Sequence, residues 1–259
     1  KNSKCSDCFD ISAIVNHIKS ANVDITKENT IEFDSKEGRE LAKKYGIEKI
    51  PALVIIGEIE KISIQGLEKD DDALLFKQTN PPYTNAATDK IEGRVTLYNL
   101  KDSACEKCSD LTILINQIKN AGVKVYQEKV IAPNSDEGQD LIKKYSIDFV
   151  PTIILSKDAA AYGIIQQAWA QIGSKETDGS YVLRVPSPPF INLTTGKLRG
   201  IVNIIYLTDI SCTECYDVSQ HKKILVNSQS FAVKLEKEET YDISDAEGKE
   251  LIRKYNITQ

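Results

Sequence analysis

The stretch RVTLYNLKDSACEKC, residues 94–108, carries the pattern that decides the expected fold. Its first seven residues are rich in valine, leucine and tyrosine, and their alternation predicts a β-strand. A short polar loop then leads to Cys105. Beyond the cysteines, apolar residues recur at helical spacing from Leu111 to Ile118. The sequence therefore predicts a strand followed by a helix that begins at Cys105.

The residues after this helix predict a second helix and three further strands. The segment Val123–Ile131 is typical of a strand, and Ser135 can cap a second helix whose first turn is acidic. We expect the third strand at Phe149–Leu155 and the fourth at Ile164–Ile172. The order β-α-β-α-β-β predicts an α/β fold, with a mixed four-stranded sheet flanked by helices.

This pattern is repeated along the chain. Residues 5–51 align with residues 105–151 without a gap, and they share the frames C-x-x-C-x-D and S-x-E-G-x-x-L-x-K-K-Y. A second ungapped match joins residues 81–108 to residues 188–215. The sequence therefore contains three copies of one unit, and the repeat indicates tandem domains.

Proline-rich stretches separate the copies. Pro81-Pro82-Tyr83 matches Pro188-Pro189-Phe190, and we interpret both as linkers. They predict domains at residues 1–80, 81–187 and 188–259. The first copy lacks the initial strand that residues 95–100 supply to the second, and the third lacks its C-terminal part. We expect the full protein to extend at both ends.

Composition limits the classes of function. The 259 residues carry a net charge of −5 and no basic stripe, which argues against a nucleic-acid partner. No apolar run has the length of a membrane span, although a signal peptide or membrane anchor outside this segment is compatible with the sequence. The six cysteines form three local pairs. Such pairing favours a redox protein or an oxidising, extracytoplasmic location: periplasmic, secreted or surface-exposed.

A strand, a C-x-x-C pair and a proline that opens a later strand resemble the thioredoxin-fold superfamily, especially its small glutaredoxin-like members. The resemblance covers all three copies and implies tandem thioredoxin-like domains. It also implies the disulfides Cys5–Cys8, Cys105–Cys108 and Cys212–Cys215. In each pair the first cysteine would be the exposed nucleophile, and the second would resolve the mixed disulfide.

The resemblance also assigns residues to a substrate groove. The family's proline is cis and lies beside the cysteine pair, which corresponds to Pro51 and Pro151 in this chain. The residues before them, Ile50 and Val150, would offer backbone groups to an extended substrate. The matching proline of the third copy falls outside the sequence.

Two functions follow as hypotheses. A helix N-terminus lowers the pKa of a thiol and so favours the reactive thiolate. The first hypothesis is therefore a thiol–disulfide oxidoreductase or isomerase that acts on protein thiols and disulfides, without cofactor or metal. The alternative is a non-enzymatic extracellular or cell-surface array with static disulfides, whose partners are neighbouring repeats. Acidic residues inside the motifs favour the array, whereas retention of both cysteines in every copy favours exchange. A zinc site would need two pairs brought together.

Overall fold

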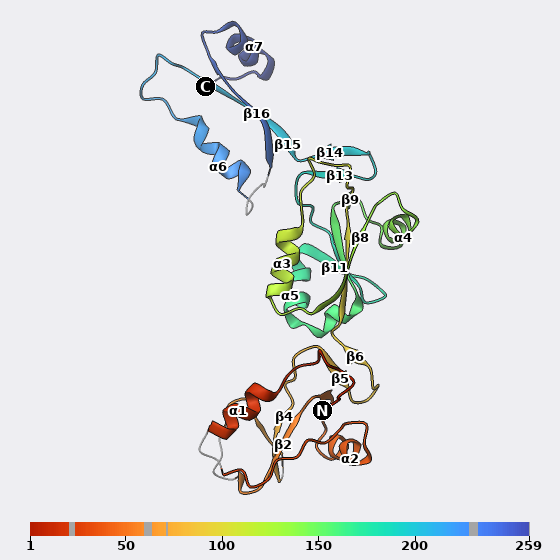
Figure 1. Ribbon diagram of the computed structural model, residues 1–259. Helices are drawn as coiled ribbons and strands as arrows, with labels where there is room; N and C mark the ends of the chain where they lie inside the picture. The colour runs from red at the N-terminus through yellow and green to blue at the C-terminus, as the bar shows by residue number, and fades with distance from the viewer. Residues whose placement is uncertain (21–23, 60–63, 71, 228–232, 259) are drawn as a thin grey trace. The chain divides into compact units, whose positions relative to one another are not determined.

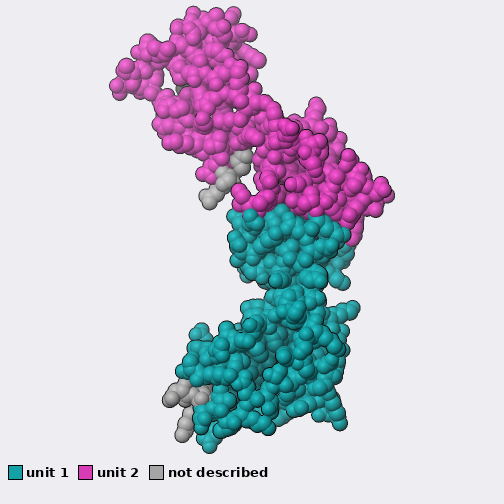
Figure 2. Space-filling view, viewed as in Figure 1, with its two compact units in different colours: residues 1–98, 114–129, 154–182 teal, residues 99–113, 130–153, 183–259 magenta. Residues whose placement is uncertain are grey.

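The computed structural model describes residues 1–20, 24–59, 64–70, 72–227 and 233–258. These residues form a mixed α/β structure with seven α-helices and several small sheets (Figure 1). Two compact units are distinguished by their contacts (Figure 2). One comprises residues 1–98, 114–129 and 154–182, and the other comprises residues 99–113, 130–153 and 183–259. The three domain boundaries expected from the repeat stay a prediction.

Among the first 92 residues, those that the structure describes form two helices and two small antiparallel sheets. One sheet has the strand order β2-β4-β3 and the other β1-β5-β6. The elements are α1 (Ser12–Ser20), α2 (Lys36–Lys44), β1 (Lys49–Ile50), β2 (Leu53–Ile56), β3 (Glu68–Asp70), β4 (Ala73–Phe76), β5 (Tyr83–Asn85) and β6 (Ile91–Glu92).

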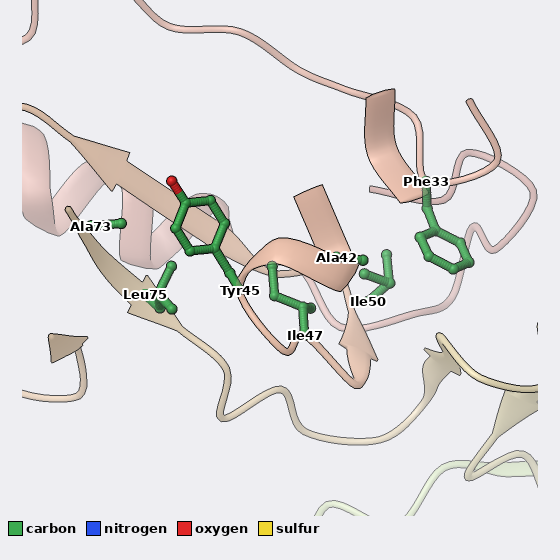
Figure 3. Packing of buried hydrophobic residues seen from close by; sticks show 7 residues of the cluster. All are labelled: Phe33, Ala42, Tyr45, Ile47, Ile50, Ala73 and Leu75. Atoms are coloured by element: carbon green, nitrogen blue, oxygen red, sulfur yellow. The ribbon is translucent and has the colours of Figure 1, made fainter. Parts of the chain in front are cut away.

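A cluster of buried apolar side chains holds α2 against these strands (Figure 3). Its members come from α2, from β1 and β4, and from the segments next to them: Phe33, Ala42, Tyr45, Ile47, Ile50, Ala73 and Leu75. Because Tyr45 is the C-cap residue of α2 and Ile47 lies two positions after it, the K-K-Y-x-I part of the repeated frame supplies two core residues.

The next segment contains a five-stranded sheet of order β11-β12-β10-β7-β8. Its central region is dry, since Val95, Leu97 and Leu100 of β7 are fully buried. The elements are β7 (Val95–Leu100), α3 (Thr112–Asn120), β8 (Val125–Ile131), α4 (Asp136–Tyr145), β9 (Phe149–Val150), β10 (Thr152–Leu155), the 3₁₀ helix η2 (Lys157–Ala161), α5 (Gly163–Ile172), β11 (Gly173–Lys175) and β12 (Tyr181–Leu183).

Most of the strands expected in this segment are confirmed, but the fourth is not. Residues 164–172 belong to helix α5, and the strand β11 begins only at Gly173. Ile165 and Trp169 are the buried residues of α5. Their spacing of four positions puts them on one helix face, which explains why an apolar run that is also typical of a strand forms a helix.

The last segment contains a short hairpin, a parallel strand pair and two helices. The hairpin strands β13 (Phe190–Asn192) and β14 (Lys197–Arg199) form a sheet with β9. The parallel pair is β15 (Ile201–Thr208) with β16 (Lys234–Asp242), accompanied by the 3₁₀ helix η3 (Val218–Gln220), α6 (His221–Val226) and α7 (Ala246–Tyr255). Across the described ranges, no helix has the length and apolarity needed to cross a membrane.

The S-x-E-G frame has a local structural explanation. Ser35 and Ser135 cap α2 and α4, accepting hydrogen bonds from the amides of Gly38 and Gly138 at 3.0 and 3.1 Å. A Cβ atom on Gly138 would lie 2.1 Å from the carbonyl oxygen of Ala132. The predicted cap at Ser135 is therefore confirmed. Gly138, whose amide donates to this cap, must be a glycine because the loop that precedes α4 lies too close for a side chain.

Candidate functional site: the cysteine loops

The sulfur atoms of all three cysteine pairs lie at disulfide-bonding distance. The S–S distances are 2.07 Å for Cys5–Cys8, 2.11 Å for Cys105–Cys108 and 2.09 Å for Cys212–Cys215. The Cα atoms in each pair are 5.4 to 5.5 Å apart. The pairing that the family resemblance implied is therefore the pairing that the structure contains.

The helix that follows each cysteine pair begins later than the sequence predicts. Helix α1 begins at Ser12 and α3 at Thr112, so the expectation that a helix begins at Cys105 is wrong. The aspartate of the C-x-x-C-x-D frame lies just before each of these helix starts. Asp10 accepts a hydrogen bond from the Ser12 amide at 2.9 Å, and Asp110 accepts one from the Thr112 amide at 2.8 Å. Each aspartate lies two positions before the first helical residue and satisfies its backbone amide, and the disulfides lie in the preceding loop.

This position weakens the expected activation of the thiols. The field of a helix dipole falls off within its first turn, and in α1 and α3 that turn lies several residues after the cysteines. Hydrogen bonds from the hydroxyl and amide of Thr112 lower the pKa of Asp110. A thiolate at Cys105 would lie outside this first turn.

The six cysteines differ in exposure. Cys5 is buried, with 7% of its surface exposed, so the expectation that the first cysteine is an exposed nucleophile is wrong for this copy. Cys215, the second cysteine of the third copy, is exposed. The remaining cysteines are half-buried: Cys8, Cys105, Cys108 and Cys212.

An arginine lies against the buried sulfur of Cys5. One terminal nitrogen of Arg94 is 3.7 Å from Cys5 Sγ, and the same guanidinium forms a two-pronged ion pair with Asp7. Its carbon Cζ lies 5.0 Å from the centre of the Tyr126 ring, a cation–π distance. Hydrogen bonding from Arg94 lowers the pKa of Asp7, which therefore stays charged. At the equivalent motif position of the second copy, Lys107 pairs with Glu236.

The structure brings the predicted site residues of the first copy together. Cys5, Cys8, Ile50 and Pro51 all line one groove of about 1650 Å³. The Ile50–Pro51 and Val150–Pro151 peptide bonds are both cis. The roles assigned to these residues in catalysis stay predictions.

The backbone at Ile50 and Val150 is paired with the chain's own hairpins. In the first copy β1 pairs antiparallel with β5, in the register Ile50 to Thr84. In the second copy β9 pairs antiparallel with β13, in the register Val150 to Ile191. We call residues 83–92 and 190–199 the closing hairpins, because each occupies the strand edge that was expected to receive a substrate.

Each closing hairpin is also connected to the cysteine loop. The residue directly after the first motif, Phe9, donates its amide to the carbonyl of Pro82 at 2.8 Å. Its counterpart Ser109 donates to the carbonyl of Pro189 at 2.7 Å. The same hydrogen bond in two copies shows that the connection is built into the repeat.

The interpretation of the Pro-Pro-aromatic stretches at residues 81–83 and 188–190 as linkers misses the hairpins that they lead into. A signal was present, because each Pro-Pro pair is followed at a fixed distance by a glycine. A Cβ atom on Gly93 would lie 2.4 Å from Pro81 Cβ, and one on Gly200 would lie 2.3 Å from Pro188 Cβ. The prolines and glycines therefore meet across a folded hairpin and not along an extended linker.

A metal centre finds no support in this region. In the part of the chain that the structure describes, no group of three or more His, Cys, Asp or Glu side chains is placed to hold a metal ion.

Comparisons of the chain with protein-family models, with curated proteins and with solved structures find no match.

Proposed function

We propose that the chain is a non-enzymatic array of three thioredoxin-like modules, covering residues 1–80, 81–187 and 188–259, in an extracytoplasmic location. In this proposal the C-x-x-C disulfides are static and stabilise the joints between modules. One observation carries it: the backbone edge at Ile50 and at Val150 is already paired with a closing hairpin of the same chain.

The closing hairpin competes directly with a substrate peptide. An extended peptide binds such an edge by adding a strand to it, and main-chain hydrogen bonds provide much of the affinity. A hairpin tethered in the same chain has an effective concentration in the millimolar range or above. A peptide substrate would have to displace β5 or β13 before it could reach these residues. This competition favours a structural role for the groove.

The disulfide has a structural task in this arrangement. Closing a loop as short as Cys5–Cys8 stabilises the fold by about 2 kcal/mol in the chain-entropy model. The closed loop fixes the backbone of the next residue, whose amide bonds to the hairpin carbonyl of Pro82. The equivalent bond from Ser109 to Pro189 repeats this connection. The disulfides Cys5–Cys8 and Cys105–Cys108 therefore each stabilise a hydrogen bond that joins a cysteine loop to the following segment.

The extracytoplasmic location is part of the same proposal. Disulfides persist in oxidising compartments and are rare in reducing ones. All six cysteines of this chain are paired, and free cysteines are absent from the described residues.

A second candidate is thiol–disulfide exchange with protein thiols and disulfides, as an oxidoreductase or isomerase. Two observations favour it. The Arg94 guanidinium lies beside Cys5, where a cation would stabilise the thiolate. Cys215 is exposed to solvent. In this mechanism Cys5, Cys105 or Cys212 would attack a substrate disulfide, and Cys8, Cys108 or Cys215 would resolve the product.

Reduction of the native protein by dithiothreitol distinguishes the two functions. Free thiols are alkylated at increasing times, and each pair is quantified by mass spectrometry of its peptide. For static disulfides we expect Cys212–Cys215 to be reduced first and Cys5–Cys8 last, following their exposure. A redox titration should place the two hairpin-covered pairs below about −300 mV.

The opposite result would support exchange. Midpoints between about −270 and −120 mV for Cys5–Cys8 and Cys105–Cys108, together with mixed disulfides trapped by Cys108→Ser, would overturn the static-array proposal. Cys8→Ser provides the matched trap in the first copy.

A further inference from the structure

In the first two copies, the residue directly before the second cysteine of the motif is charged. It is Asp7 in the first copy and Lys107 in the second. Each pairs with a residue of the proposed module that follows: Asp7 with Arg94, and Lys107 with Glu236. We call these two contacts the first joint and the second joint. Both joints use the same motif position, but with opposite sign of charge.

The ion pair of the first joint is largely shielded from water. The side chains of Asp7 and Arg94 are only 19% and 27% exposed, and Arg94 Nε donates to Asp7 at 3.0 Å. The guanidinium also lies against the Tyr126 ring of β8. The residue before Arg94 is held in place, because the Tyr162 hydroxyl donates to the carbonyl of Gly93 at 2.6 Å. The second module therefore presents a positioned cation to the first motif.

The second joint has different residues at the same positions. The ungapped match that begins at the Pro-Pro pairs places Ile201 at the position of Arg94. The shared E-G frame places Glu236 at the position of Tyr126. Glu236 belongs to β16 and accepts a hydrogen bond from Lys107 Nζ. In this joint the charge that meets the motif is therefore an anion, and it comes from the neighbouring strand.

Three positions change together between the joints. They hold Asp7, Arg94 and Tyr126 in the first joint, and Lys107, Ile201 and Glu236 in the second. If the two sets were mixed, Asp7 would face Glu236, and Lys107 would face Arg94. Contacts between like charges are a means by which interfaces reject wrong partners. Such rejection matters in a repeat protein, because misassembly between similar domains is its characteristic failure.

We propose that the residue directly before the second cysteine is the specificity-determining residue of each joint and selects the next module of this chain by charge. Asp7 selects a module with a cation directly before its first strand. Lys107 selects a module with an anion on the strand equivalent to β8. This inference rests on the proposed array of modules and extends it. The disulfide closes the loop, and the charge between the cysteines determines which module binds to it.

The test transplants the residues of the second joint into the first joint of the full chain. Three variants are compared with the original chain: Asp7→Lys, the pair Arg94→Ile with Tyr126→Glu, and the triple variant that combines them. Hydrogen exchange is followed without reductant in the peptides that contain Phe9 and Pro82, whose backbone hydrogen bond connects the cysteine loop to the closing hairpin.

Each incomplete transplant should open the first joint. Asp7→Lys brings two cations together, and Arg94→Ile with Tyr126→Glu leaves Asp7 beside a carboxylate. Either change should accelerate exchange in the joint peptides at least about tenfold. The triple variant should return to within about threefold of the original rate, because opposite charges meet again. The peptide that contains Ser109, in the second joint, is the internal control and should not change.

A triple variant that exchanges as fast as Asp7→Lys alone would overturn the proposal, because Asp7 would then serve only the local structure of its loop. The exposed second joint provides the same test with little risk to folding. Lys107→Glu should accelerate exchange around Ser109 about threefold, and adding Glu236→Lys should restore the original rate. Failure of Glu236→Lys to restore it would equally contradict selection by charge.

The outcome is distinguishable from failure of the proposed function. The static disulfides are tested by reduction and redox titration, whereas the charge variants are compared with every disulfide closed. Redox-active cysteines would overturn the static array and would leave the expected recovery in the triple variant unchanged.

Discussion

Replacement of Tyr83 by alanine should release the closing hairpin and expose the Cys5–Cys8 disulfide to reduction. Tyr83 begins β5 and is buried, with 6% of its surface exposed. Its hydroxyl donates to Glu92 at 3.0 Å, and its ring lies under the ammonium of Lys49 at 4.7 Å. Burial, together with the bond to Glu92, raises the pKa of Tyr83 to about 12, so the phenol remains a donor at neutral pH.

The size of the effect follows from this burial. Truncating a buried aromatic side chain to alanine costs about 3 to 5 kcal/mol, and we take the lower value for a residue in a short, three-stranded sheet. If this loss falls on local opening of the hairpin, the open population rises roughly 100-fold, since 1.4 kcal/mol corresponds to a factor of ten. Reduction of Cys5–Cys8 that requires opening should then be accelerated by the same factor.

The assay is the time course of reduction by dithiothreitol, with alkylation and peptide mass spectrometry for each pair. The matched control is Phe190→Ala in the second closing hairpin. Phe190 is half-buried against Phe149, so this variant should accelerate reduction of Cys105–Cys108, to a smaller extent, and leave Cys5–Cys8 unchanged. A Tyr83→Ala variant whose hairpin amides exchange faster while Cys5–Cys8 is reduced at the original rate would refute the reasoning.

Three further outcomes are expected. Gly138→Ala should destabilise the chain by at least about 1 kcal/mol, because the added Cβ would lie 2.1 Å from a carbonyl oxygen. The control Gly163→Ala, which has free space around the added Cβ, should stabilise α5 slightly. The midpoints of urea unfolding measure both changes. The Asp7–Arg94 pair should stabilise the folded chain above pH 3.8, and this contribution should be lost as the pH falls through the lowered pKa of Asp7. In the Asp7→Asn variant, the free energy of unfolding should therefore depend less on pH in the acid range. Leu97→Ala, at a fully buried position of β7, should cost about 2 to 5 kcal/mol in urea unfolding followed by the fluorescence of the single tryptophan, Trp169.

Local signals in the sequence predicted a large part of the secondary structure. The cap at Ser135 and the strand at Val95–Leu100 were predicted correctly, because a capping side chain and an alternating apolar pattern act within a few neighbouring residues. The pairing within each C-x-x-C motif followed from the family resemblance, which agrees with the disulfide distances in the structure. The mixed α/β class followed from the order of these elements.

The errors arose where two local interpretations compete. The stretch at residues 164–172 has apolar residues at spacings that suit either a strand or a helix, and packing of Trp169 against Tyr181 accompanies the helix. At Cys105 the cysteine and the aspartate five positions later were both able to begin a helix. The hydrogen bonds that Asp110 accepts from Thr112 decide in favour of the later start.

The sequence by itself determined the repeat, the positions of the cysteine pairs and several of the strands and helices of the second copy, because these depend on patterns that can be read along the chain. Only the tertiary structure decided what covers each cysteine loop. The pairing of Ile50 with Thr84 and of Val150 with Ile191 joins residues more than thirty positions apart. No local pattern specifies such contacts, since they depend on which strand edges remain open once the helices have packed.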